Sequence, residues 1–278
     1  MGTLYVVATP IGNLEDITLR ALRVLRSVAL IAAEDTRATK KLLAKYDIET
    51  PLTSYFEHNK LTKLDYILGV VQEKDVAIVS EAGTPGISDP GFELIRAAIE
   101  RDIRVVPVPG PSAVIAALSV SGLPTDQFVY VGFLPRRRGE RRRALQLLAL
   151  EPRTIVAYEA PHRLLESMQD IEEVLGNRRI AVARELTKMH EEILRAPVAR
   201  AISHFAANPP RGEFTLLIEG AEKQPRVLEA DEIEERLRQL VARGVSSKEA
   251  ISVVAHEAAV PRREVYRLWL DIKNTISC

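Results

Sequence analysis

Residues 76–91 read VAIVSEAGTPGISDPG, a short apolar strand pattern followed by a loop rich in glycine and proline. The stretch IRVVPVPGPSA at residues 103–113 repeats this arrangement, and a helical pattern follows each loop. Glycine lets a backbone approach a ligand closely. We expect strands 76–79 and 103–106 to end side by side, so that both loops line one binding site at the carboxyl edge of a sheet. Ordinary strand-to-helix turn chemistry is the alternative for either loop alone.

The residues that close the two loops favour helix starts. Asp89 is a good N-cap residue and Pro90 suits the first helical position. Gly110 and Pro111 repeat this arrangement in the second loop. We therefore predict that a helix begins at each of these pairs.

Apolar strand patterns alternate with amphipathic helical patterns along most of the chain, which predicts an α/β fold. In the first half we expect strands at 4–8, 28–33, 76–79 and 103–106 and helices near 18–27, 36–46, 60–73 and 111–120. In the second half we expect strands at 128–131, 154–158, 180–183, 192–194 and 213–219 and helices near 140–150, 161–175 and 198–207. The short, closely spaced strands of the second half predict a mixed, partly antiparallel sheet.

Breaks in these patterns divide the chain into three regions. Glycine and proline punctuate residues 121–126, which predicts an N-terminal α/β domain over 1–121 and a second α/β domain over 122–222. A linker is expected at 222–230, and residues 231–278 read as a helical extension.

The extension contains a helix-turn-helix-like pattern. Ser246 to Glu249 form a capping-box sequence, and apolar residues follow at helical spacing up to a turn at 259–261. A second helical pattern follows the turn and carries Arg262, Arg263 and Arg267, which favours contact with RNA. A helical cap that only packs on the core is the alternative interpretation.

Composition excludes several protein classes. The chain has 278 residues and one cysteine, Cys278, so no intrachain disulfide or thiol cluster can form, and we expect a reducing, cytoplasmic setting. No basic leader precedes the first strand pattern and no apolar run of about 18 residues occurs, so neither secretion nor a membrane span is expected. Lysine plus arginine and aspartate plus glutamate each number 38, so only local charge clusters can indicate a nucleic-acid partner.

One such cluster holds six arginines within eight positions. They are Arg136, Arg137, Arg138, Arg141, Arg142 and Arg143. Glu140 cannot neutralise all of them, so we predict contact with RNA phosphates. A solvated helix start is the alternative.

The sequence offers no signature for a metal or for two common cofactor classes. The five histidines show no paired ligand spacing, so no protein-bound metal is expected. The chain also has no Walker-type loop and no Gly-x-Gly-x-x-Gly fingerprint, which argues against phosphoryl transfer and nicotinamide chemistry.

Seven segments occur in the order and spacing of one known family. They are residues 6–14, 33–37, 80–91, 107–113, 158–163, 184–188 and 212–216, and together they span roughly residues 4–220. On these motifs the chain resembles the tetrapyrrole-methylase superfamily of S-adenosylmethionine-dependent methyltransferases. Within that superfamily it is most similar to the subgroup that methylates ribosomal RNA.

The resemblance implies a homodimer of two-domain α/β subunits with the methyl donor in the cleft between the domains. It also implies methyl transfer to the ribose 2′-hydroxyl of a cytidine in the decoding region of small-subunit ribosomal RNA, with the ribosomal subunit as the expected partner. Gly83-Thr84-Pro85 replaces the Gly-Asp-Pro of the porphyrin-modifying members, which argues against a tetrapyrrole substrate. Two alternatives stay open: a tetrapyrrole methyltransferase and a non-catalytic ribosome-binding module.

Matching the family's motifs to this sequence gives the expected donor-binding residues. They are Pro10, Ala82, Gly83, Thr84, Ile87, Ser112, Ala113, Tyr158, Glu159 and Leu186. Their types suit the donor, because a flat adenine needs apolar walls while the amino-acid end needs backbone groups and hydroxyls.

Catalysis needs further groups, because a ribose hydroxyl is a poor nucleophile at neutral pH. A base must accept its proton and a nearby cation favours the developing oxyanion. Glu34 with Arg37, and Glu185 with Lys188, supply both kinds of group within one turn. We expect Glu34 or Glu185 as the base and the two cations on the substrate side. Solvated ion pairs at helix ends are the alternative.

Overall fold

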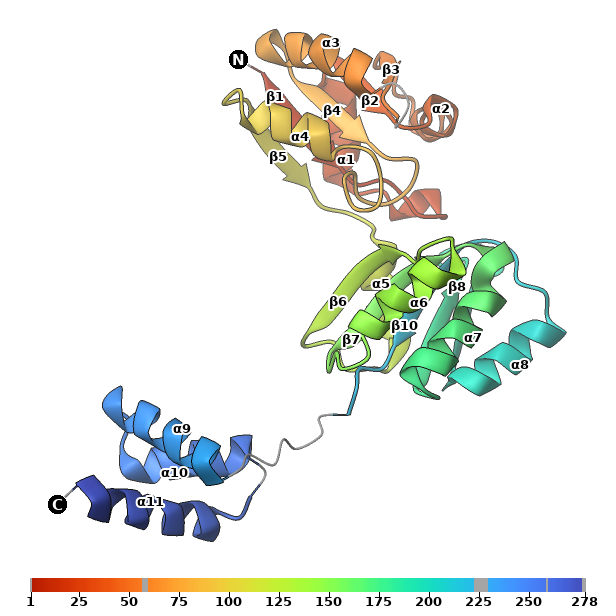
Figure 1. Ribbon diagram of the computed structural model, residues 1–278. Helices are drawn as coiled ribbons and strands as arrows, with labels where there is room; N and C mark the ends of the chain where they lie inside the picture. Colours follow the sequence, from red (N-terminus) through yellow and green to blue (C-terminus); the bar gives the residue numbers. More distant parts are fainter. Residues whose placement is uncertain (1, 57–59, 223–229, 259, 277–278) are drawn as a thin grey trace. The chain divides into compact units, whose positions relative to one another are not determined.

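A computed structural model of the chain describes residues 2–56, 60–222, 230–258 and 260–276. The chain forms two compact units, residues 1–221 and residues 222–278. The first unit contains two five-stranded sheets, and the second contains three helices (Figure 1). Most of the linker expected at 222–230, residue Ala259 of the expected turn, and Cys278 lie outside the described residues.

The first sheet is wholly parallel and has helices on both faces. Its strands are β1 (Thr3–Val7), β2 (Leu30–Ala33), β3 (Leu52–Ser54), β4 (Val76–Val79) and β5 (Arg104–Val108), in the order β3-β2-β4-β1-β5. Its helices are α1 (Leu19–Ser27), α2 (Thr36–Lys45), α3 (Lys60–Glu73) and α4 (Phe92–Ile99). Side chains alternate across the sheet, so that Ile78 packs with α3 and α4 while Val79 packs with α1 and α2. Burial on both faces explains the uniformly apolar strand at 76–79.

The expectation that β4 and β5 end side by side is wrong. Strand β1 lies between them and pairs in parallel with both. The two glycine loops nevertheless meet beyond the strand ends, where the Thr84 hydroxyl donates a hydrogen bond to the Pro111 carbonyl at 3.4 Å.

The second sheet is mixed, which confirms the prediction for this half of the chain. Its strands are β6 (Phe128–Phe133), β7 (Thr154–Glu159), β8 (Arg179–Arg184), β9 (Glu192–Pro197) and β10 (Phe214–Ile218), in the order β6-β7-β10-β8-β9. Only the β6–β7 pair is parallel. One face is covered by α6 (Arg138–Leu147), α7 (Leu164–Leu175) and α8 (Val198–Ala207).

The other face of the second sheet is covered by α5 (Ala113–Ser121). Its residues Val114 and Leu118 share a core with Val156 of β7 and Leu217 of β10. The chain therefore passes from one sheet to the other at residues 109–112. This crossing point lies before the glycine- and proline-rich break at 121–126, from which the domain boundary was predicted.

The second unit consists of α9 (Ala230–Ala242), α10 (Ser247–Glu257) and α11 (Arg262–Ile276), packed around its own apolar core. The Oγ atom of Ser246 accepts a hydrogen bond from the backbone N–H of Glu249 at 3.3 Å, as the capping-box sequence predicts. The predicted helical extension is confirmed. Across the described residues, every helix is too short or too polar to span a membrane.

Candidate functional site

Three loops of the first unit meet at the carboxyl edge of the parallel sheet. They follow β1, β4 and β5. Thr9 and Gly83 join the first two loops through reciprocal backbone hydrogen bonds of 2.8 and 3.0 Å. In the third loop, a Cβ atom on Gly110 would approach the Cβ of Ala8 to 3.1 Å, so glycine permits the close contact between the loops after β1 and β5. The edge is therefore a preformed backbone cradle.

The predicted helix caps in these loops are wrong. Helix α4 begins at Phe92, and its N-cap residue is Gly91, whose φ of 146° suits glycine. Asp89 lies two residues earlier, so its carboxyl is not committed to the helix. In the third loop Ser112 is the N-cap residue of α5, in place of Gly110.

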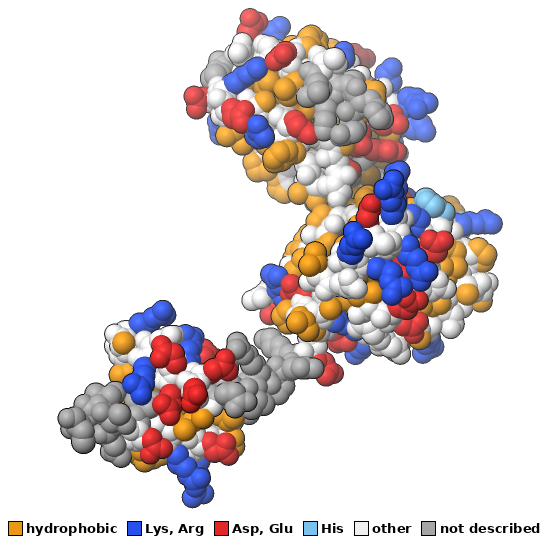
Figure 2. All heavy atoms as spheres, in the orientation of Figure 1, with side chains coloured by type: hydrophobic (Ala, Val, Ile, Leu, Met, Phe, Trp, Pro, Cys, Tyr) orange, Lys and Arg blue, Asp and Glu red, His pale blue; other side chains and the backbone are white. Residues whose placement is uncertain are grey.

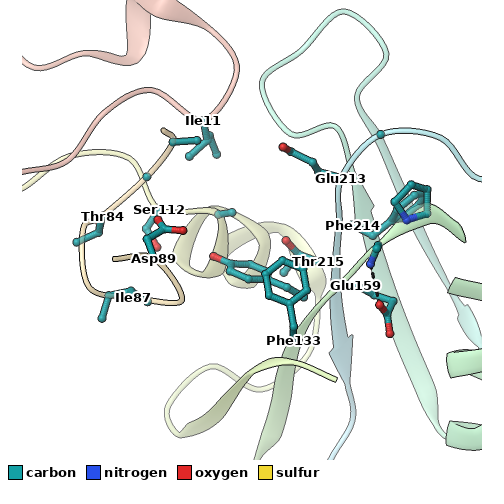
Figure 3. A pocket seen from close by; sticks show the side chains of 17 residues that line it. Ile11, Thr84, Ile87, Asp89, Ser112, Phe133, Glu159, Glu213, Phe214 and Thr215 are labelled. Atoms are coloured by element: carbon teal, nitrogen blue, oxygen red, sulfur yellow. Dashed lines mark hydrogen bonds between the residues drawn. The ribbon is translucent and has the colours of Figure 1, made fainter. Parts of the chain in front are cut away.

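A cavity of about 350 Å³ lies between the cradle and the second sheet (Figure 3). Eight of the ten predicted donor-binding residues line it: Ala82, Gly83, Thr84, Ile87, Ser112, Ala113, Tyr158 and Glu159. The remaining lining comes mainly from residues that sequence reasoning did not select, among them Ile11, Asp89, Phe133, Glu213, Phe214 and Thr215. Glu213 and Phe214 belong to a motif that carries the resemblance, which is the signal that could have identified them.

Aromatic rings form one wall of this cavity. The Tyr158 ring lies 5.4 Å from the rings of both Tyr130 and Phe133, measured between centroids. The Tyr130 hydroxyl forms a 2.6 Å hydrogen bond with the hydroxyl of Ser88, which connects this wall to the loop after β4. The cavity therefore combines an aromatic wall with a loop that this wall holds in place.

Three of the predicted donor-binding residues have surroundings that change their expected role. The Glu159 carboxylate is buried, and it accepts hydrogen bonds from the Ala160 backbone N–H and Ser167 and pairs with Arg163. It is therefore committed to joining the end of β7 to the first turns of α7, although the residue borders the cavity. Leu186 is buried in the core that contains α5 and does not line the cavity. Pro10 lines a neighbouring cavity instead.

This second cavity has a volume of about 310 Å³ and shares Ile11, Ala82 and Glu213 with the first. Lys188 lines it, and its Nζ atom lies 2.8 Å from Glu185 and 2.9 Å from Glu213. Burial alone would lower the pKa of Lys188, but these hydrogen bonds raise it overall. Lys188 is therefore held in its protonated form where the two cavities meet, paired with two carboxylates.

The other three predicted catalytic residues line neither cavity. Glu34 accepts the backbone N–H of Glu81 at 3.1 Å, and its burial raises its pKa. Glu185 is also partly buried, but hydrogen bonds from Lys188 and from the Glu213 backbone hold its pKa below the usual value, which makes it a weak base. The Arg37 side chain is 91% exposed and lies 3.9 Å from Asp35.

Among the carboxyl groups that line the first cavity, Asp89 has the most strongly shifted pKa. Burial raises its pKa to about 7, and the nearby carboxylates of Glu34, Glu81 and Glu213 contribute to the increase. On the opposite wall, Tyr130 and Tyr158 lie close enough for the Asp89 charge to raise their pKa values further. No cation pairs with Asp89 in the described part of the chain.

The arginine cluster splits into two groups. Carboxylates of α7 neutralise three of its members: Arg138 lies 3.0 Å and Arg141 2.7 Å from Asp170, and Arg142 pairs with Glu173. The Arg141 side chain is only 1% exposed, so the prediction that it contacts RNA is wrong. Arg141 can be buried because it pairs with Asp170, which lies 29 positions further along the chain. A count of charges among neighbouring residues does not reveal this partner.

Arg136, Arg137 and Arg143 remain exposed at the surface. Arg137 lies 3.5 Å from Glu140, and we find no ion pair for Arg136 or Arg143 within the described residues. Figure 2 shows blue side chains gathered over α6, with red carboxylates beside them. In the second unit, Arg262 and Arg263 are also exposed. These five residues stay predicted RNA contacts.

Metal binding receives no support from the described residues. No group of three or more histidine, cysteine, aspartate or glutamate side chains among them is arranged to hold a metal ion.

Comparison with known proteins places this geometry among methyltransferases. The family model of the tetrapyrrole (corrin/porphyrin) methylases matches residues 3–202. Ribosomal RNA small subunit methyltransferase I of Synechocystis sp. is 49% identical over 276 residues, which cover 98% of this chain and 99% of that protein. The protein of the same name from Thermotoga maritima is 51% identical over 223 residues, which cover 80% of this chain and 100% of its own length.

Among solved structures, uroporphyrin-III C-methyltransferase from Thermus thermophilus complexed with S-adenosyl homocysteine matches with a TM-score of 0.57. It is 19% identical, and the match covers 78% of this chain and 97% of that one. At this identity the likeness concerns the fold.

Proposed function

Because this chain belongs to the tetrapyrrole (corrin/porphyrin) methylase family, we propose that it is an S-adenosylmethionine-dependent methyltransferase of small-subunit ribosomal RNA. The acceptor is the ribose 2′-hydroxyl of a cytidine in the decoding region. The observation that carries this proposal is the 49% identity over nearly the full length of a relative named for that RNA. Tetrapyrrole methylation is not favoured, because the solved porphyrin-modifying neighbour is only 19% identical.

The first cavity fits the methyl donor by size and by chemistry. A volume of about 350 Å³ is within the range of small-ligand sites, which are mostly apolar with a few placed polar groups. Ile11, Ala113 and the Tyr158 ring offer apolar walls, while Thr84 and Ser112 offer hydroxyls beside backbone groups. When bound, S-adenosylmethionine supplies a methyl group that is already activated for displacement.

The remaining catalytic work is alignment and charge stabilisation by the protein. The second cavity shares three residues with the first and therefore offers the acceptor ribose a place beside the donor. Lys188 donates two of its three N–H groups to Glu185 and Glu213, and the third would donate a hydrogen bond to the acceptor oxygen while the hydroxyl proton passes to solvent water. The rings of Phe133 and Tyr158 would exclude water from the donor side.

Two measurements test the proposed function directly. Isothermal titration calorimetry of the purified full chain should give saturable heat with S-adenosylmethionine. Ribose-methylation mapping in cells that lack the protein should show the loss of a single 2′-O-methyl group, on a cytidine of small-subunit ribosomal RNA. Absence of donor binding together with an unchanged methylation map would contradict the proposal.

The Asp89 carboxyl makes donor affinity depend on pH. Its pKa of about 7 makes it mostly neutral near about pH 6 and mostly ionised near about pH 8. S-adenosylmethionine carries a net positive charge that S-adenosylhomocysteine lacks, so the ionised carboxylate should favour the donor. We expect donor affinity to increase roughly tenfold over this range, as the ionised fraction does.

Calorimetry at several pH values measures this effect, with S-adenosylhomocysteine, which lacks the sulfonium charge, as the comparison. Asp89→Asn should bind the donor with little dependence on pH. A pH dependence that survives this substitution would assign it to another group.

Phosphate contact is expected first from the cluster's three arginines that do not pair with carboxylates of α7. Replacing Arg136, Arg137 and Arg143 together by glutamine should lower the slope of log affinity against log salt by about 2, since each lost phosphate contact to single-stranded RNA changes it by about 0.7. The matched control replaces Arg20, Arg23 and Arg26, exposed residues of α1, and removes the same charge. Equal slopes for the two triple variants, from RNA binding at several salt concentrations, would argue against contact by the cluster.

The assembly and setting of the enzyme are also part of the proposal. We propose a cytoplasmic homodimer that acts on the ribosomal subunit and contacts RNA through both the arginine cluster and the helical extension. The resemblance to the family supports these statements, and light scattering of the purified chain measures its mass in solution.

A further inference from the structure

A groove lies between the last two helices of the helical unit. It is lined by Ser247, Lys248 and Ile251 of α10 and by Arg262, Arg263, Tyr266 and Trp269 of α11, and it has a volume of about 370 Å³. All of these residues belong to one compact unit with its own core. The groove is therefore a property of that unit and does not depend on the donor site.

Two aromatic rings lie along one side of the groove. Arg262, Tyr266 and Trp269 occupy positions i, i+4 and i+7 of α11, which places them on one face of the helix. Val265 is fully buried in the core of the unit, and Trp269 packs partly against the same core. Tyr266 is 51% exposed. The groove thus presents aromatic surface that the unit itself leaves open.

The charged residues that line the groove are all basic. Lys248, Arg262 and Arg263 line it, no acidic residue does, and none of these three cations forms an ion pair within the described residues. Elsewhere in the unit, Arg236 lies 2.9 Å from Glu257 and Arg238 lies 3.8 Å from Glu234. Unpaired cations beside open aromatic rings suit a ligand that combines anionic groups with a flat ring.

We propose that this groove binds one unpaired nucleotide of RNA, with its base against Tyr266 and Trp269 and its flanking phosphates against Lys248, Arg262 and Arg263. The identification of that RNA as ribosomal rests on the proposed function. Stacking of a base on an aromatic side chain contributes favourably and tolerates any base, because every base has a π face. A duplex hides those faces, so the site prefers single strands. An acidic peptide would satisfy the cations and leave the rings unused.

The groove contains its own spectroscopic probe, because Trp269 is the only tryptophan of the chain. We expect a short single-stranded RNA to quench the fluorescence of the full chain saturably. A hairpin duplex of equal length should quench it much less, and so should the single strand with an abasic nucleotide at every position.

Substitutions separate stacking from charge. Tyr266→Ala should weaken binding of a labelled single strand about tenfold by fluorescence anisotropy, while Tyr266→Phe keeps the ring and should bind like the unmodified chain. Arg262→Gln with Arg263→Gln should lower the salt slope by about 1.4. Arg243→Gln removes an exposed cation that does not line the groove and serves as the control.

Three results would overturn the proposal. They are the absence of quenching at RNA concentrations that saturate binding, equal quenching by polyglutamate, and a Tyr266→Ala variant that binds like Arg243→Gln. Circular dichroism of each variant checks that the helices persist. Calorimetry with S-adenosylmethionine keeps this question apart from the proposed function, because the donor does not depend on the groove and should bind the Tyr266→Ala variant unchanged.

Discussion

Replacing Ala113 with phenylalanine is expected to weaken binding of S-adenosylmethionine by about 100-fold or more. Ala113 is the first residue of α5 and lines the first cavity. A benzyl group there would occupy space that the donor needs in a cavity of about 350 Å³. A loss of about 2.7 kcal/mol in binding free energy corresponds to 100-fold in affinity. Calorimetry with the purified variant measures the loss, and RNA methylation should fall with it.

The same helix offers a matched control. Ile115 lies two residues further on, is 56% exposed, and does not line the cavity. Ile115→Phe therefore adds a ring to the same helix and should leave donor affinity close to its original value. Donor binding of full strength by Ala113→Phe would show that the donor occupies another site.

The second large effect concerns the stability of the second sheet. Asp170→Ala is expected to lower the free energy of unfolding by about 3–5 kcal/mol, because it leaves the buried Arg141 charge with only the exposed Glu166, 3.7 Å away. The side chains of Arg141 and Asp170 are each 1% exposed, and Asp170 also accepts a 3.0 Å hydrogen bond from Arg138. For a protein of this size the melting temperature should fall on the order of 10 °C.

Thermal unfolding followed by circular dichroism measures this change. Arg141→Met combined with Asp170→Leu removes both charges and fills the space, so it should recover much of the loss. Arg143→Gln, in the same helix but exposed, should change the melting temperature little. Wild-type stability in the Asp170→Ala variant would contradict the assignment of Arg141 as a buried structural residue.

The positions of most helices and strands could be predicted from the sequence because they depend on local periodicity. Strand β4 has the predicted bounds, and α3 covers the predicted residues 60–73. The order of strands could not be predicted in the same way. The position of β1 between β4 and β5 depends on pairing between residues about 100 and 70 positions apart, such as Thr3 with Arg104 and Leu4 with Val76.

The interpretation of Asp89 shows a second limit. Asp-Pro is a good local signal for a helix start, but the loop is held by distant partners. Gly83 bonds to Thr9, and Ser88 bonds to Tyr130 of the second sheet. These contacts delay the helix to Phe92, with Gly91 as its N-cap residue. The carboxyl that local chemistry assigned to capping faces the cavity instead.

The candidate site was predicted by family motifs more fully than by residue chemistry. The motifs selected eight residues that line the first cavity, and they also selected Leu186, which the fold buries. The charge count of the arginine cluster was a correct observation. It could not reveal that half of the cluster would pair with Glu166, Asp170 and Glu173 on α7.

Residues 109–112, which connect the first sheet to the second, link ligand binding to movement of the two sheets. Within the first unit this segment is the single covalent connection between the two sheets, and it also supplies Ser112 to the wall of the cavity. Rotation of one sheet against the other must therefore change the backbone torsions of a segment that a bound molecule would touch. Rotation of the two sheets away from each other would then also loosen the contacts that hold the spent donor. Residues 109–112 would serve both as the hinge and as part of the binding site.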